Sequence, residues 1–384
     1  MRPWEQTAAT LRTVDPAGVV AVNGPGRHGA RSDGASRYPE GVNVRTGIRS
    51  GLPRLKAKGA VLLGVANERA SLAIARMDHA TAGRASGVMR IRGSIRTDRL
   101  VVYTHYSGRG VAADWEVACL ARAREAGLGV CAVVTSAAGS SVDEAPWLHS
   151  SDLLLLRRNR GRDLGAYRDA VEYLRRHDYP GSFALTNNSV LWREDAFVLL
   201  YRDSERLGAE IAGATSSLQI VPHLQSFWLW VAPGVVSTPA ARALTAGWRN
   251  YRTRSAAIVY GELPVSSVTT AQGLQTGAVY PYERAVDELR RAEAHPAGSH
   301  PSTTARRRLV LSVVDNGQPL NPTHFMWSEL LALGLPGIKR DLVVLNPAHI
   351  GDHDQIEVVA RQHGLNIDKL VGTQAARSRA DLYA

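Results

Sequence analysis

The order of apolar and polar positions changes near Arg99 and predicts where the folded core begins. From there, short apolar runs alternate with segments whose apolar residues recur every three or four positions, which is the pattern of strands followed by helices. The runs predict buried strands at Leu100–Thr104, Leu128–Thr135, Leu153–Leu156 and Phe183–Leu185. The periodic segments predict helices at Asp114–Ala126 and Asp163–Arg176. This alternation is typical of an α/β fold with a mostly parallel sheet flanked by helices.

The same pattern also predicts the segment that precedes this core and further elements within it. Residues 1–55 are rich in Gly, Arg, Ser and Pro, so we expect residues 1–97 to be a poorly structured basic extension, with a short apolar run at Ala60–Val65 and a helix at Asn67–Met77. Within a core of residues 98–290, a further strand is predicted at His223–Val231 and a helix at Pro239–Tyr251.

Beyond residue 290 the pattern predicts three more pieces. The polar stretch Arg291–Arg307 is predicted to be a linker, and Leu309–Val314 a last strand. That strand belongs to a C-terminal segment, residues 308–350, which closes the core, and residues 351–384 form a tail.

Composition excludes several classes of protein. Of the 384 residues, 45% are hydrophobic and 21% are charged, which is ordinary for a globular chain. No apolar run approaches the roughly 18–20 residues that span a bilayer. The first residues also lack the apolar stretch of a secretory signal. We therefore expect a soluble, cytoplasmic protein.

The net charge of +11 raises the question of nucleic-acid binding. Only four of the 46 basic residues are lysine, and the arginines are scattered with no basic stripe interleaved with aromatic residues. This distribution disfavours nucleic acid, whereas a general affinity for phosphates or an anionic membrane surface stays compatible with the charge. The two cysteines, Cys119 and Cys131, lie in apolar surroundings and are predicted to be small buried hydrophobes.

Polar clusters follow three of the predicted strands. They are His105–Gly108, Asn159–Tyr167 and Asn187–Ser189. Ligands of open α/β sheets bind beyond the carboxyl ends of the strands, so the clusters predict one crevice, suited to a nucleotide diphosphate. Gly161 allows close backbone approach, Asp163 can cap the helix that follows, and the start of a helix favours an anion. The Gly-x-Gly-x-x-Gly spacing is absent, which disfavours a dehydrogenase.

Five segments in order carry a resemblance to a known family. They are Asn159–Tyr167, Leu185–Val190, His223–Phe227, Asn321–Trp327 and Gly334–Asp341. Together they resemble the rhamnan synthesis F family of glycosyltransferase-like proteins, over roughly residues 98–347. The resemblance implies a core like the GT-A type of nucleotide-sugar transferase.

The resemblance also implies a function. The protein would move a sugar, with dTDP-L-rhamnose as the favoured donor, onto a cell-surface polysaccharide or lipid-linked glycan, with inversion and at the inner face of the membrane. The predicted donor-binding residues are Tyr103, His105, Asn159, Gly161, Arg162, Asp163, Asn187, Asn188, Ser189, His324, Lys339 and Arg340.

The sequence departs from the family where an acidic metal-binding motif would stand. Asn187 and Asn188 occupy that position, and neutral amides replace carboxylates poorly as ligands of Mg²⁺ or Mn²⁺ beside a diphosphate. Three alternatives stay open: a divalent cation held elsewhere, neutralisation by Arg162, Lys339 and Arg340, or a non-catalytic relative that binds a glycan or a partner enzyme of the same pathway.

Inverting transfer needs a base for the acceptor hydroxyl. The candidates for this catalytic role are Glu262 and His223, and we hypothesise that Glu262 is the base while His223 and Gln225 contact acceptor or donor. The alternatives are a solvated carboxylate for Glu262 and a structural histidine for His223. Trp228 and Trp327 are predicted to wall the acceptor side or to belong to the core. The segment Asn321–Trp327 reads either as a lid whose His324 reaches the diphosphate or as a plain helix start.

Overall fold

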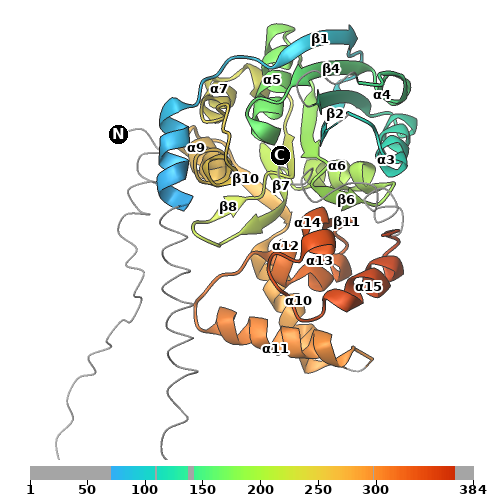
Figure 1. Cartoon of the computed structure of the whole chain (residues 1–384), viewed down its shortest axis with the longest axis vertical. Coiled ribbons are helices and arrows are strands. Elements are labelled where there is room, and N and C mark those ends of the chain that lie inside the picture. The colour runs from blue at the N-terminus through green and yellow to red at the C-terminus, as the bar shows by residue number, and fades with distance from the viewer. Residues whose placement is uncertain (1–70, 109, 137–141, 297, 368–384) are drawn as a thin grey trace, which may run out of the picture.

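The computed structural model describes residues 71–108, 110–136, 142–296 and 298–367. Its centre is a nine-stranded sheet (Figure 1). The main strands follow one another across it in the order β1-β4-β3-β2-β5-β9-β7-β10, and β8 pairs with β7. The bounds are β1 Val88–Gly93, β2 Arg99–Ser107, β3 Gly129–Ser136, β4 Leu153–Arg158, β5 Ser182–Asn187, β7 Ile211–Ser217, β8 His223–Leu224, β9 Trp228–Val231 and β10 Thr276–Tyr280.

The sheet is parallel at its centre and mixed towards its edges. β4, β3, β2 and β5 run parallel, as do β7 and β10, whereas the pairings of β1, β8 and β9 are antiparallel. The central strands are covered on both faces, which explains why they read as continuous apolar runs rather than as alternating patterns. The predicted α/β class, with a large sheet flanked by helices, is confirmed.

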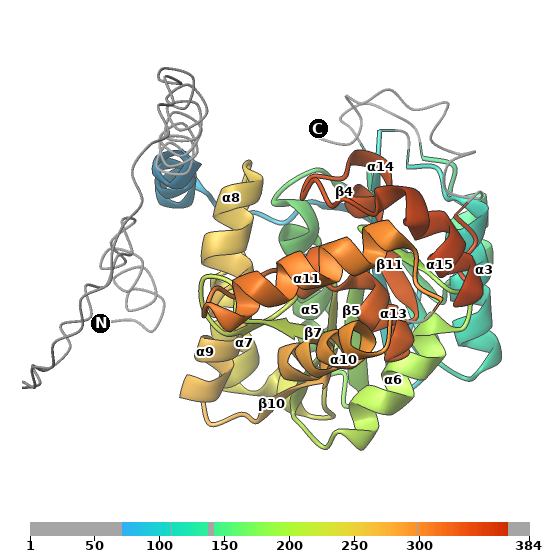
Figure 2. The same ribbon diagram turned by 90° about the horizontal axis from the view of Figure 1, so that it is seen from below.

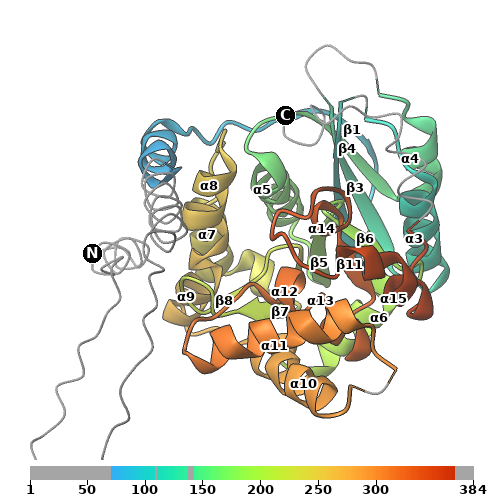
Figure 3. The same cartoon turned by 60° about the horizontal axis from the view of Figure 1, so that its bottom comes forward.

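Alternate side chains of β2 enter two separate cores. Val101 and Tyr103 pack with α3 (Asp114–Glu125), α6 (Ala196–Arg206) and α10 (Tyr282–Ala294) on one face. Leu100 and Val102 pack with α5 (Arg162–Arg176), α7 (Pro239–Ala246) and α9 (Pro264–Ala271) on the other. Figure 3 shows these two helical layers on opposite sides of the sheet.

The two cysteines behave as predicted. Both are buried and free, Cys119 in the first core and Cys131 in the second. Burial raises the pKa of both thiols far above the usual range, so they stay protonated.

Beyond the core the structure corrects the predicted linker and last strand. α10 extends to Ala294, and α11 (Pro301–Asp315) covers most of the remaining segment, including Leu309–Val314. Figure 2 shows α11 lying across this side of the molecule, beside α10. The strand prediction failed because a short apolar run fits both periods: Arg306 and Val310, four residues apart, are buried, whereas Leu309 is 66% exposed.

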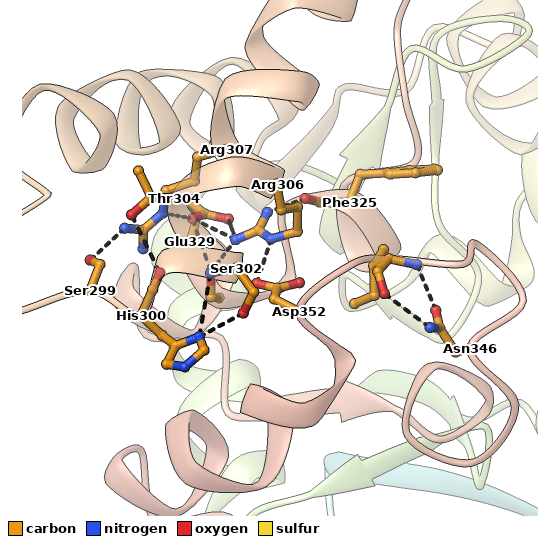
Figure 4. Close-up of polar contacts among 12 residues, drawn as sticks. Ser299, His300, Ser302, Thr304, Arg306, Arg307, Phe325, Glu329, Asn346 and Asp352 are labelled. Atoms are coloured by element: carbon orange, nitrogen blue, oxygen red, sulfur yellow. Dashed lines mark hydrogen bonds and ion pairs between the residues drawn. The ribbon is translucent and has the colours of Figure 1, made fainter.

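A buried ionic network fixes α11 to the C-terminal segment (Figure 4). The Arg306 guanidinium donates to Asp352 at 2.8 Å, to Ser328 at 2.6 Å and to Glu329 at 3.0 Å, and also to the Phe325 carbonyl. Ser328 and Glu329 belong to α13 (Trp327–Ala332). The predicted tail, residues 351–384, is also folded as far as residue 367. Its helix α15 (Ile356–Gln362) packs in the core that contains Val101 and Tyr103.

The predicted N-terminal extension is wrong for its last part. Residues 71–81 are helical and pack beside α8 (Arg254–Ala257), as the blue helix in Figure 3 shows. β1 then pairs with β4 as an edge strand of the sheet. The remainder of the extension, including Ala60–Val65 and the start of the predicted Asn67–Met77 helix, lies outside the described residues.

Two smaller predictions also change. The helix predicted at Pro239–Tyr251 ends at Ala246, and the strand predicted at His223–Val231 is interrupted between β8 and β9. Within the described part of the chain, no helix is both long and apolar enough to cross a membrane.

Candidate functional site

A cavity of about 310 Å³, the main cavity, lies at the carboxyl ends of β2, β3 and β5 and at the start of α5. Its other walls are α8, the π-helical turn η2 (Ile258–Glu262), α12 (Pro322–Phe325), β11 (Gly337–Lys339) and α14 (Arg340–Leu345). Most of the predicted site residues line it, namely His105, Asn159, Arg162, Asp163, Asn187, Asn188, Ser189, Gln225, Glu262, His324, Lys339 and Arg340. Segments far apart in the sequence therefore meet where parallel strands end.

Three predicted contacts lie in the core instead. Tyr103 is fully buried and donates its hydroxyl hydrogen to Glu116 at 2.6 Å. Trp228 is fully buried and donates to Ser204 at 3.1 Å, and Trp327 is 2% exposed. None of the three lines the main cavity, so their predicted direct contacts with donor or acceptor are corrected to packing roles.

The loop before α5 brings a helix start to the cavity wall. Gly161 precedes the first turn with φ 79°, and Arg162 has φ 54°, so two successive residues are left-handed. Asp163 was predicted to cap this helix, but Gly161 occupies the capping position and no side chain caps it. Asp163 instead accepts a hydrogen bond from the Asn187 amide at 3.1 Å. The uncapped N–H groups of the first turn favour an anion there.

A buried arginine that sequence reasoning missed holds this loop. Arg157, at the end of β4, is fully buried and donates to the Arg160 carbonyl at 2.6 Å and to Asp169 at 3.1 Å. Burial lowers the Arg157 pKa, and the Asp169 charge opposes that shift. Gly165 adds to the tight fit, because a Cβ there would lie 2.1 Å from the Arg160 carbonyl oxygen. The sequence signal that could have identified Arg157 is its place among the charged residues that end the apolar run of β4.

The amides after β5 act as hydrogen-bond donors within the site. Asn187 donates to Asp163, while its side-chain oxygen accepts from the Ser189 backbone at 3.0 Å. Asn188 donates to the Tyr106 carbonyl at 3.0 Å. A carboxylate at Asn187 could accept but not donate, and it would face the Asp163 carboxylate.

The C-terminal segment supplies cationic groups. Lys339 Nζ lies 4.5 Å above the Phe227 ring and donates to Ser189 at 3.3 Å. Burial lowers the Lys339 pKa, and the charges of Asp341 and Glu262 act against that shift. The Arg340 backbone N–H donates to the Ser189 carbonyl at 2.9 Å, which joins this segment to the loop after β5.

Asp341 organises the same wall. Arg254 lies 3.1 Å from its carboxylate, and His324 Nε2 lies 3.2 Å from it. Burial alone would raise the Asp341 pKa, but the His324 hydrogen bond and the Lys339 charge outweigh burial and hold that pKa well below its usual range. Asp341 is therefore ionised at neutral pH and orients the Arg254 and His324 side chains.

Glu262 closes the π-helical turn η2, a rare element that often marks functional sites. One of its carboxylate oxygens accepts hydrogen bonds from the Ser226 backbone at 3.1 Å and from the Ser226 hydroxyl. The other oxygen lies 3.9 Å from His223 Nε2. His223 Nδ1 lies 2.8 Å from the Val221 carbonyl, which only accepts, so Nδ1 is the donor in this hydrogen bond. His223 does not line the main cavity.

Gln225 lies in the segment between β8 and β9, where the predicted strand is interrupted. Gln225 lines the main cavity, accepts from Thr215 at 2.7 Å and donates to Asn321 at 3.2 Å. His105 also lines the cavity but is 1% exposed, paired with Glu116 at 2.7 Å. Sequence reasoning missed Glu116, which lies on α3 and carried no motif.

The residues present do not fit a resident divalent cation. Across the described ranges, no group of three or more His, Cys, Asp or Glu side chains is arranged to hold a metal ion. The carboxylates that line the cavity, Asp163, Glu262 and Asp341, each accept hydrogen bonds from protein donors. Burial raises the Asp163 pKa, and the Arg162 charge is the largest opposing influence.

The fold and the cavity define an α/β protein with a polar cavity at the carboxyl edge of its parallel strands. No family model matches the chain. Two sequences of virulence protein VirA from Vibrio anguillarum are 24% identical over 208 residues, which is 53% of this chain and 66% of VirA. The chain thus spans just under two thirds of the length of these relatives. A crystal structure of 4-diphosphocytidyl-2C-methyl-D-erythritol synthase matches with a TM-score of 0.30 and 11% identity, over 48% of this chain and 89% of that one.

Proposed function

We propose that the protein transfers a glycosyl group from a nucleotide diphosphate sugar to a cell-surface polysaccharide or lipid-linked glycan. One observation carries the proposal: the main cavity combines the start of α5 with Arg162, Lys339 and Arg340, and it places the Glu262 carboxylate in another wall. The cationic groups suit a diphosphate, and a carboxylate suits a base for the acceptor hydroxyl.

In this mechanism the diphosphate lies against the start of α5. Glu262 takes the proton of the acceptor hydroxyl as its oxygen bonds to the anomeric carbon. The bond from that carbon to the diphosphate oxygen breaks with inversion, and the nucleoside diphosphate leaves with the bonding electrons. Arg162, Lys339 and Arg340 stabilise the charge that develops on it. No step requires a metal ion.

The sugar and the location are further parts of the proposal. The resemblance to the rhamnan synthesis F family, with its GT-A-like core, favours dTDP-L-rhamnose as donor. The net charge of +11 suits work at an anionic membrane surface, where lipid-linked acceptors lie.

A second candidate function is non-catalytic binding of a glycan or of a partner enzyme. It is favoured by Asn187 and Asn188, whose amides are already engaged as donors, to Asp163 at the start of α5 and to the Tyr106 carbonyl of β2. This candidate predicts binding of a nucleotide sugar without turnover, or no such binding.

Calorimetric titration of the full chain tests the proposal. The ligands are dTDP-rhamnose, UDP-glucose and GDP-mannose, each with and without Mg²⁺ or Mn²⁺. We expect one preferred donor, a similar affinity without the metal, and loss of affinity in Lys339→Met but not in the exposed control Arg242→Gln. The proposal fails if none of the donors binds in any condition. Binding of a donor with no transfer to any glycan acceptor would favour the second candidate.

A further inference from the structure

A second cavity, of about 510 Å³, opens beside the main cavity; we call it the outer cavity. Its walls are residues 81–83, the loop at 159–162 and residues 250–252. Asn159 and Arg162 line both cavities. The chain that forms the outer wall at Arg252 reaches the main cavity at Arg254 and continues to Glu262. A ligand in the outer cavity would therefore lie next to one in the main cavity, across the boundary formed by Asn159 and Arg162.

The outer cavity is cationic. Arg160, Arg162 and Arg252 line it, and no carboxylate does among the residues the structure describes. Arg160 and Arg252 are exposed, and no described group accepts a hydrogen bond or forms an ion pair with either guanidinium. The nearby Asp78 carboxylate is occupied by the backbone N–H groups of Arg252 at 2.9 Å and Thr253 at 2.8 Å.

The boundary between the cavities is conformationally restrained. Gly161 and Arg162 are both left-handed, and a Cβ on Gly161 would lie 2.8 Å from the Arg249 carbonyl oxygen. Arg162 Nε donates to the Arg252 carbonyl at 3.3 Å, which fixes the side chain at this boundary. A non-glycine residue held at positive φ costs energy and persists where the surroundings enforce it, often at functional sites.

We propose that the outer cavity binds the acceptor by a phosphate ester on it. This inference rests on the proposed transferase function, which supplies the need for an acceptor. Arginine side chains present paired donors that match phosphate oxygens, and three of them surround one hollow. A phosphate held by Arg160 and Arg252 lets the rest of the acceptor pass Arg162 into the main cavity, where Glu262 takes the hydroxyl proton. The phosphate ester belongs either to a lipid diphosphate or to a phosphorylated glycan.

The first test is titration of the full chain with inorganic pyrophosphate, using dTDP to fill the main cavity. The double variant Arg160→Gln/Arg252→Gln should bind pyrophosphate about tenfold more weakly, because each lost guanidinium removes charge-assisted hydrogen bonds. The control Arg206→Gln/Arg242→Gln removes the same charge from exposed positions on α6 and α7 and should change the affinity less than twofold. Equal weakening in both variants, or in neither, overturns the proposal.

The second test distinguishes a lipid diphosphate from a phosphorylated glycan, and it distinguishes failure of this proposal from failure of the proposed transferase function. Tighter binding of farnesyl diphosphate than of pyrophosphate supports a lipid diphosphate, and tighter binding of glucose 1-phosphate supports a phosphorylated glycan; either preference must weaken in Arg160→Gln/Arg252→Gln. If neither compound loses affinity in that variant, the proposal is overturned. If the proposed transferase function is wrong, the results differ from these. The wild-type protein then binds no nucleotide sugar, whereas its binding of pyrophosphate, measured without dTDP, is still weakened in Arg160→Gln/Arg252→Gln.

Discussion

Replacing Arg306 by glutamine should destabilise the chain far more than replacing the neighbouring exposed arginine. The side chains of Arg306, Glu329 and Asp352 are 2%, 0% and 0% exposed, so the network is removed from water (Figure 4). Arg306→Gln leaves Asp352 with no cationic partner among the described residues, and Glu329 keeps Arg307, at 2.7 Å, as its cationic partner. Breaking a buried ion pair from one side costs about 3–5 kcal/mol because a charge stays buried without compensation.

The matched control lies two residues away on the same helix. Arg308 is 69% exposed and pairs with Glu293 at 2.7 Å, an interaction worth about 0.2–1 kcal/mol. Urea unfolding of the full chain at pH 7 measures both variants. A loss of about 3–5 kcal/mol corresponds to a melting temperature lowered by roughly 4–8 °C, because the unfolding entropy of a chain of this size is about 0.6–0.8 kcal/mol/K. If Arg306→Gln and Arg308→Gln unfold within about 1 kcal/mol of each other, the network does not stabilise the fold as argued.

The loss of stability in Arg306→Gln should also depend on pH in a definite direction. In the wild type, burial alone would raise the Glu329 pKa, but the Arg306 charge outweighs it and lowers that pKa. A carboxyl with a lowered folded-state pKa contributes stability above its unfolded pKa, and that contribution is lost as pH falls through the folded-state value. In Arg306→Gln the buried Glu329 loses the Arg306 charge that lowers its pKa, so protonation costs the variant less than the wild type, and the difference in unfolding free energy should shrink between pH 7 and pH 4. A constant difference would contradict the assignment.

Three further predictions concern the cavity and its loop. Glu262→Gln should lower kcat by about 10²–10⁴ while donor affinity by calorimetry changes less than twofold; unchanged turnover in a folded variant removes Glu262 as the base. His324→Ala should weaken donor binding in the same titration, and unaltered binding would return this histidine to a structural role. Gly165→Ala should lower the unfolding free energy by about 1–3 kcal/mol, because its Cβ would lie 2.1 Å from the Arg160 carbonyl oxygen. Gly351→Ala, where a Cβ meets nothing within 4 Å, is the control, and equal effects would refute the steric argument.

The central fold could be predicted because its signals are local. Each strand from β2 to β5 is an apolar run buried on both faces, and parallel strands bring their carboxyl ends to one edge. The polar residues after those strands therefore meet without knowledge of the long-range pairing. That logic placed Asn159 and Asn187 in one cavity, whereas Lys339, which lines the same cavity, was assigned to the site only through the family resemblance.

What the sequence left undetermined depends on contacts between distant residues. Arg157 binds Asp169, 12 residues further along the chain, yet its role at the site appears only when the Arg160 carbonyl is seen to be a second partner. α11 was mistaken for a linker and strand because the burial of Arg306 is decided by Asp352, 46 residues away. Trp228 and Trp327 were wrongly expected to contact a ligand, because an indole suits a hydrophobic core as well as the wall of a binding site.

The amide at Asn187 is consistent with the charges around it. The position touches Asp163, and a second carboxylate 3.1 Å from the first would require a cation between them or a proton on one of them. Asn187 removes that requirement, since its amide donates to Asp163 and its oxygen accepts from Ser189. Ser189 in turn binds Lys339, which brings a positive charge to the same edge of the sheet. Asp163, Asn187, Ser189 and Lys339 thus form one hydrogen-bonded unit, which holds the Lys339 amine at the carboxyl edge of the sheet.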